Sequence, residues 1–202
     1  MINRSFRQIL FLVPLVTLAL ALAACGSSSS SSTTAASGGS STSTSEAQAA
    51  ATGDIPDTQK FLKFKNTKAG YSIPYPEGWA QKGSANDVTF SDKGNSVHIV
   101  ISKGAAPTVS SVAAELKKQA ANDPTLKPGT PQQMTVGAGP AIHVVYHLQG
   151  PPDPVTGKRL TLMVDRYVLA SHGRVATVDE STPVGVDNVD AYRMIINGFK
   201  WS

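Results

Sequence analysis

Two histidines and an aspartate have the spacing most suggestive of chemistry in this 202-residue chain. His143 and His147 are four residues apart in an alternating segment, so on a strand they share one face. A simple hairpin register places Asp165 opposite His143 and Thr161 opposite His147. Imidazole and carboxylate groups ligate Zn²⁺ and similar ions. At about 3.3 Å per residue, however, the two histidines stand roughly 13 Å apart, too far to hold one ion together. The sequence favours polar side chains on a less buried face, with His143 and Asp165 as minor metal-site candidates.

Three aromatic residues near a turn are minor candidates for partner recognition. Tyr71, Tyr75 and Trp79 surround the turn at Glu77, and aromatic side chains are enriched at protein interfaces. More often such residues fill the core, and we expect that role here. The proline-rich loop Gly150–Gly157 is another candidate for partner binding, because it is expected to be exposed and stiff.

No motif of an established enzyme class is present in the sequence. There is no G-x-S-x-G elbow, no H-E-x-x-H signature and no phosphate-cradling glycine loop. Cys25 is the only cysteine, so no intramolecular disulfide and no thiolate metal cluster can form. We therefore expect no catalytic residues, no enzymatic activity and no bound cofactor other than lipid.

The first 24 residues have the pattern of an export signal. Arg4 and Arg7 precede a run of 16 mostly apolar residues, Ile9–Ala24. A membrane-spanning helix needs about 20 apolar residues, and this run is followed by glycine and serines instead of a basic flank. The pattern predicts a signal peptide over residues 1–24.

The segment Leu22-Ala23-Ala24-Cys25 directly follows this apolar run. It resembles the lipobox of bacterial lipoproteins, whereas Leu22 at position −3 is poor for ordinary signal peptidase. The resemblance implies a diacylglyceryl thioether on Cys25, cleavage before it, and N-acylation, with palmitate among the chains. At about 0.8 kcal/mol per buried CH₂, two or more chains give stable anchoring. We expect a protein anchored by lipid to the extracytoplasmic face of the cell membrane. A secreted protein with an incidental cysteine is the alternative.

Residues 25–56 are predicted to be the lipidated cysteine followed by a disordered tether. The segment is rich in Ser, Thr, Ala and Gly, has no aromatic residue, and is almost uncharged. Such a chain buries too little apolar surface to offset its ordering entropy. Its expected end-to-end distance is about 30 Å, and its hydroxyl groups are candidate glycosylation sites.

The charge balance argues against nucleic-acid binding. Without the two signal arginines, the chain keeps 16 basic and 14 acidic side chains, and a nucleic-acid footprint needs a clustered basic face. One local cluster comprises Lys60, Lys63, Lys65 and Lys68. We interpret these lysines as protection of a solvated strand edge, with weak attraction to anionic lipid head groups as the alternative.

Residues 57–202 are predicted to form one domain. Alternating apolar positions predict strands at 61–65, 71–75, 88–90, 97–101, 134–136, 141–149, 159–170 and 174–179. Helices are predicted over 109–120, capped by Ser110 or Ser111, and over 189–197, capped by Asp187. Strands in a run, with the helices segregated from them, indicate an α+β domain with an antiparallel sheet.

Two segments of this domain resemble the PsbP-like family. These are Gly70–Trp79 (GYSIPYPEGW) and Ala191–Trp201 (AYRMIINGFKW), and the order of elements between them also fits. The resemblance implies the Mog/PsbP-like fold, an α/β/α sandwich around an antiparallel β-sheet. The LpqN-type envelope lipoproteins of actinobacteria share the lipobox, the low-complexity tether and the single domain. A shared fold does not by itself carry function.

These observations predict a non-enzymatic, membrane-anchored envelope lipoprotein. Its domain is expected to bind a protein partner or an envelope component, and no nucleic acid. The alternative is carriage of a small ligand, lipid or metal ion in the envelope, with His143 or Asp165 contributing. A hydrolase is the weakest alternative, because no nucleophile and base can be placed together.

Overall fold

The computed structural model describes residues 51–153 and 155–202. The predicted signal peptide, Cys25 and most of the predicted tether lie outside the described residues. Within those residues, no helix is both long enough and apolar enough to cross a membrane. The elements are, in order, β1 (Phe61–Asn66), β2 (Tyr71–Pro76), β3 (Ala80–Ser84), β4 (Asp87–Asp92), β5 (Asn95–Lys103), α2 (Val109–Asn122), β6 (Lys127–Pro128), β7 (Gln132–Val136), β8 (Gly139–Pro152), β9 (Arg159–Ser171), β10 (Arg174–Pro183), α3 (Val189–Gly198) and β11 (Lys200–Trp201).

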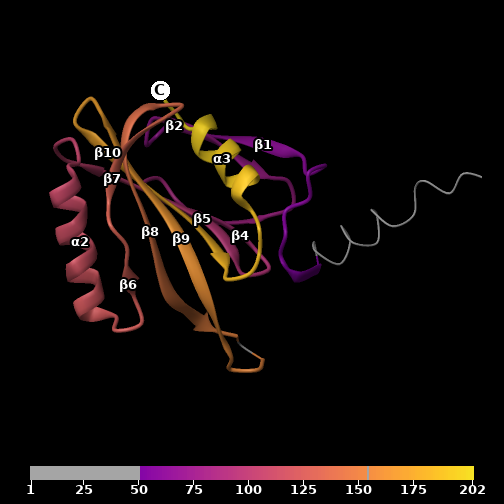
Figure 1. Ribbon diagram of the computed structural model, residues 1–202. Helices are drawn as coiled ribbons and strands as arrows, with labels where there is room; N and C mark the ends of the chain where they lie inside the picture. Colours follow the sequence, from indigo (N-terminus) through magenta and orange to yellow (C-terminus); the bar gives the residue numbers. More distant parts are fainter. Residues whose placement is uncertain (1–50, 154) are drawn as a thin grey trace, which may run out of the picture. The chain divides into compact units, whose positions relative to one another are not determined.

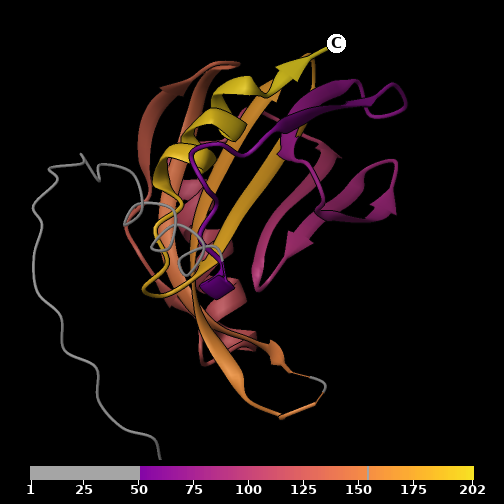
Figure 2. The ribbon, with the colours of Figure 1, turned by 90° about the vertical axis from the view of Figure 1, so that its right-hand side faces the viewer.

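A large antiparallel sheet forms the centre of the domain. Its strands follow the order β3-β4-β5-β10-β9-β8-β6, and β7 pairs with β8 on the same side as β6. The long strands β8, β9 and β10 form its middle, and the β8–β9 hairpin projects beyond the rest of the sheet (Figures 1 and 2). The antiparallel sheet predicted from the sequence is confirmed.

Helix α2 covers one face of this sheet. The period-2 alternation along β8 directs Ile142, Val144 and Tyr146 to that face, as the sequence predicted. They pack against Val112 and Leu116, the two buried residues of α2. A 3.6-residue period brings these two helical positions onto one side, so a single apolar stripe attaches α2 to the sheet.

The opposite face is covered by helix α3 together with a three-stranded sheet of order β1-β2-β11. Tyr192, Ile195 and Ile196 of α3 join Tyr71 and Ile73 of β2 in one hydrophobic core. Figure 1 shows α2 and α3 on opposite sides of the strands β8 and β9. The domain is thus mostly antiparallel β-sheet with two helices, which confirms the predicted α+β class.

Both helix caps differ from the sequence prediction. Thr108, not Ser110 or Ser111, caps α2: its hydroxyl accepts from the Ser111 amide at 3.1 Å, and the Ser111 hydroxyl accepts from the Thr108 amide at 2.9 Å. Helix α3 begins at Val189, as predicted, but its cap position is Asn188, one residue after the predicted Asp187. The predicted cap, Asp187, accepts only from the Val189 amide, at 3.3 Å.

Asn188 instead binds the beginning of the described chain. Its side-chain oxygen accepts from the Ile55 amide at 2.7 Å, and its amide donates to the Gly53 carbonyl at 3.3 Å. Asn95 donates to the same carbonyl, and Thr182 joins the two asparagines. Ile55 belongs to the hydrophobic core. Residues 53 to 55, just before Asp57, thus pack against the domain.

Asn188→Ala is expected to lower the free energy of unfolding by about 2 kcal/mol, because it leaves the buried Ile55 amide without its acceptor and removes the donor to the Thr182 hydroxyl. Urea unfolding measures this loss. Hydrogen exchange at the Ile55 amide should also accelerate, because that amide donates to Asn188. Asn86→Ala, at an exposed position, is the matched control and should change little. Unchanged protection at Ile55 in Asn188→Ala would contradict the role assigned to Asn188.

Candidate functional site

The strand β7 lies between two hollows of the molecular surface. We call the first the α3-side groove; its volume is about 260 Å³. Its floor is Met163, Asp165 and Tyr167 of β9, and its walls are β7 and the side of α3 that carries Tyr192 and Arg193. The groove forms because α3 packs over β9 and β10 and leaves the neighbouring residues of β8 only partly covered.

The end of this groove is held in place by the turn between β7 and β8. The Gly137 amide donates to the side-chain oxygen of Asn197 on α3 at 3.0 Å. A side chain at position 137 would collide with the backbone of Asn197, so only glycine permits this approach. The turn and the end of α3 are therefore fixed relative to each other.

His143 and Asp165 are in contact at the floor of the groove, but not by the predicted register. The structure pairs His143 with Tyr167 and His147 with Met163, a shift of two residues from the prediction. The correct cross-strand partner of Asp165 is Val145. Asp165 nevertheless reaches the His143 ring diagonally, with Nε2 and Oδ1 at 2.8 Å. The ring also stacks on Tyr167, with centroids 4.6 Å apart, so His143 is held on two sides.

These two side chains do not complete a metal site. In the described ranges, no three His, Cys, Asp or Glu side chains are grouped closely enough to hold a metal ion. His147 is exposed and does not converge with His143. The His143–Asp165 pair offers one charge-assisted contact, which orients both groups without forming a coordination sphere.

A buried carboxyl group that the sequence analysis overlooked lies next to Asp165. Glu180 of β10 pairs with Asp165 across the two strands, is 0% exposed, and has no hydrogen-bond partner for either oxygen among the described residues. Burial, reinforced by the charges of Asp165 and Asp179, raises the pKa of Glu180 well above its ordinary value. This shift favours the neutral form of its carboxyl group.

Two tyrosines of the groove are also kept neutral. The pKa values of Tyr167 and Tyr192 are both raised, mainly by burial and secondly by the electrostatic effect of the neighbouring Glu180. The Tyr192 hydroxyl donates to the Ser181 carbonyl at 2.6 Å. The floor of the groove thus combines neutral aromatic groups with a single paired carboxylate, Asp165.

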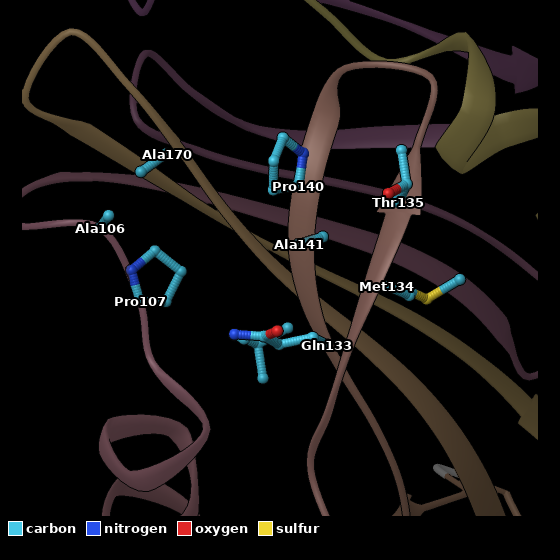
Figure 3. Close-up of a pocket in the computed structure, with 9 residues that line it drawn as sticks. Ala106, Pro107, Gln133, Met134, Thr135, Pro140, Ala141 and Ala170 are labelled. Carbon is cyan, nitrogen blue, oxygen red and sulfur yellow. The ribbon is translucent and has the colours of Figure 1, made fainter.

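The second hollow, which we call the α2-side hollow, has a volume of about 490 Å³. It lies on the α2 face, between β7 with its partner β8 and the segment that leads into α2 (Figure 3). Mostly small or apolar residues line it, among them Ala106, Pro107 and Ile142. Figure 3 shows Gln133 and Met134 pointing to opposite sides of β7. Met134 and Thr135 line both hollows, so the two meet at this strand.

The aromatic candidates lie in the core. Tyr71 is 0% and Trp79 is 9% exposed, and Tyr75 stacks on the buried Phe90 at a centroid distance of 4.2 Å. They support the packing between the two sheets and present no aromatic surface patch. The candidate loop 150–157 lies at the tip of the β8–β9 hairpin, where Val155 is 90% exposed.

Comparison with known proteins was made at the level of sequence and of structure. No protein-family model and no curated protein matches the chain. Cyanobacterial PsbP (CyanoP) from Synechocystis superposes with a TM-score of 0.50 at 17% identity, over 74% of this chain and 98% of that one. LpqN of Mycobacterium tuberculosis, involved in cell envelope biogenesis, gives 0.42 at 17% identity, over 71% and 91%.

Two further solved structures are similar at lower sequence identity. The Ran-binding protein Mog1p of Saccharomyces cerevisiae gives a TM-score of 0.46 at 7% identity, over 70% of this chain and 95% of that one. A Bacteroides thetaiotaomicron protein is longer; the chain spans 48% of it at 14% identity, with 69% of this chain covered and a TM-score of 0.43. Identities this low carry the fold alone. Together with the topology described above, the superposition on CyanoP assigns this chain the PsbP-like fold that the two sequence segments predicted.

Proposed function

We propose that this chain is an extracytoplasmic lipoprotein, anchored through Cys25, whose PsbP-like domain binds a protein partner or an envelope component and performs no catalysis. The structural observation that supports binding is the surface around β7. It presents an exposed strand between two hollows whose walls are largely apolar or aromatic. Recognition sites usually bind a partner through shape complementarity and hydrogen bonds, and this surface can provide both.

The anchoring half of the proposal depends on the sequence. The lipobox-like segment, the apolar run before it and the low-complexity segment after it all precede the described domain. LpqN and Mog1p are named for envelope biogenesis and for Ran binding. With TM-scores below 0.5, these two proteins carry no argument about the partner of this chain.

Cys25→Ser is expected to release the protein from the membrane, because no acyl chain can then be attached. The wild-type protein should sediment with membranes after a carbonate wash and should incorporate labelled palmitate. In Cys25→Ser the fraction bound to membranes should fall at least tenfold, since stable anchoring requires acyl chains. Cell fractionation with immunodetection measures both outcomes.

A matched control moves the thiol without removing it. The double variant Cys25→Ser, Ser27→Cys keeps one cysteine but displaces it from the lipobox-like segment, and it should behave as the single variant does. Membrane retention of Cys25→Ser, or absence of palmitate from the wild-type protein, would contradict the anchoring proposal.

A further inference from the structure

Nearly every strand at the edge of a sheet in the described domain carries a lysine. Lysine on an edge discourages pairing with foreign strands, because pairing would desolvate the charge. The large sheet ends at β3 on one side and at β6 with β7 on the other, and the small sheet ends at β1 and β11. The edge lysines are Lys63 and Lys65 of β1, Lys82 of β3, Lys127 of β6 and Lys200 of β11. The exception is β7, whose sequence is QQMTV.

The unprotected strand is also accessible. Gln132, Gln133, Met134 and Thr135 are all exposed, and Val136 alone is buried. Among the described strands only β8 pairs with β7. The other edge of β7 therefore presents backbone N–H and C=O groups to solvent. Figure 1 shows β7 between α2 on one side and α3 on the other.

Backbone groups arranged in this way fit one class of ligand. Alternating N–H and C=O groups along an extended strand are matched by another extended backbone, not by a helix or a small molecule. In such pairing the backbone supplies affinity, and pockets for alternate side chains supply specificity. The β7 edge has both parts, because a hollow adjoins it on each face of the sheet.

The two hollows define the side chains of the ligand. On one face, an added strand would place a side chain beside Gln133 or Thr135, which line the α2-side hollow with Pro107 and Ile142. The next side chain would lie on the other face beside Met134, which is 37% exposed and borders the α3-side groove. The surroundings of both positions favour apolar side chains in the ligand. Because β7 carries no charged residue, its edge favours an uncharged segment.

We propose that β7 is a docking edge for an extended, uncharged segment of a partner protein, which adds a strand to the large sheet and places consecutive apolar side chains on its two faces. This inference deepens the proposed function and rests on it in one respect: the component that the domain binds must be a protein. The edge strand, its missing lysine and the two adjoining hollows are independent observations that agree on the same ligand.

The probe for the test is a phage-displayed library of random dodecapeptides, selected on the full chain in detergent micelles. Selected peptides should share consecutive apolar residues in an uncharged segment. Their binding should slow hydrogen exchange of amides in β7. Methylating one peptide nitrogen that faces β7 should weaken binding about tenfold, the effect of losing one inter-strand hydrogen bond, whereas methylating its neighbour should not.

Protein variants give a matched pair. Gln133→Lys supplies β7 with the charge found on the other edges and should weaken peptide binding at least tenfold. Gln81→Lys makes the same change on the exposed edge strand β3 and should leave binding unchanged. Urea unfolding of both variants verifies that the fold is intact.

Three results would overturn the proposal. These are the absence of any enriched peptide, protection of amides outside β7, and a dimer in which the β7 edge is already paired with a second copy. Because the selection uses no membrane, its failure is distinguishable from a failure of anchoring. If Cys25→Ser behaves as expected and no peptide binds, the docking edge alone is refuted.

Discussion

Asp179→Ala is expected to lower the free energy of unfolding by about 3–5 kcal/mol, because it leaves the Arg166 guanidinium buried without its counter-ion. Arg166 is 8% exposed. Its Nε and one Nη donate to the two carboxylate oxygens of Asp179, each at 2.7 Å. This two-pronged geometry is among the strongest arrangements available to an ion pair.

The same guanidinium attaches α2 to the sheet. Its Nη1 donates to the side-chain oxygen of Gln119 on α2 at 2.9 Å, and its Nη2, which also binds Asp179, donates to the Tyr146 hydroxyl at 3.0 Å. Burial alone would lower the pKa of Arg166, but the hydrogen bonds and charge of Asp179 outweigh it, so the pKa is raised. Arg166 thus remains charged, and losing Asp179 exposes the full cost of its burial.

Urea unfolding followed by tryptophan fluorescence measures the loss. Asp190→Ala removes a second Asp–Arg pair, with Arg193, whose side chains are 89% and 65% exposed; it should cost no more than about 1 kcal/mol. The double variant Arg166→Met, Asp179→Leu removes both charges and should recover most of the stability lost in Asp179→Ala. If Asp179→Ala costs no more than Asp190→Ala, the pair is not buried in the way described.

The parts of the fold that the sequence predicted are those with a long periodic pattern. The apolar positions of β8 alternate over its whole central stretch, and the structure places Ile142, Val144 and Tyr146 together beneath α2. The stripe that includes Val112 and Leu116 predicted α2 for the same reason. The short strands β3, β6 and β11 were not predicted, because segments of two to five residues carry too little pattern to distinguish them from loops.

The His143–Asp165 contact shows what a pattern cannot supply. Alternation identifies which residues share a face, but the register between two strands depends on the connection. The β8–β9 ladder has an irregularity between Gln149 and Pro152. The observed register differs from the predicted one by two residues, an even number, so His143 and Asp165 stayed on one face and met diagonally.

Glu180 was overlooked although the sequence contained a signal for it. It follows Ala176 and Val178 at the same alternating, inward phase of β10. The predicted strand ended at Asp179, so the charged residue at the next inward position was not considered. A charged residue in the phase of a core strand is a warning of a buried ionisable group. Continuing the alternation to Pro183 would have placed it under α3.

The free energy of unfolding is expected to fall as the pH rises above the ordinary glutamate pKa of 4.5, because of Glu180. The raised pKa means that the folded protein holds this proton after the unfolded chain has released it. Between the two pKa values the folded state binds one proton more, so stability decreases by about 1.4 kcal/mol per pH unit. Glu180→Gln removes the titrating group and should abolish this slope.

The other groups with shifted pKa values do not produce the same fall in the free energy of unfolding. Burial raises the pKa of Tyr167 and Tyr192, which stay neutral in this range. The carboxylates of Asp123 and Asp153 have lowered pKa values through hydrogen bonds in their turns, so they add stability that is lost as the pH falls, which is the opposite sign. The charged groups that adjoin Glu180 or line the groove above it are Asp165, Asp179 and Arg193, and His143 contacts Asp165; all are unchanged in Glu180→Gln.

Urea unfolding at several pH values between about 5 and 8 compares the wild-type protein with Glu180→Gln. Glu77→Gln, at an exposed position, is the matched control and should keep the wild-type slope. Parallel curves for the wild-type protein and Glu180→Gln would mean that Glu180 is ionised in the folded state, and its place in the core would need another counter-ion. A slope that vanishes only in Glu180→Gln would establish a neutral carboxyl group between the sheet and α3.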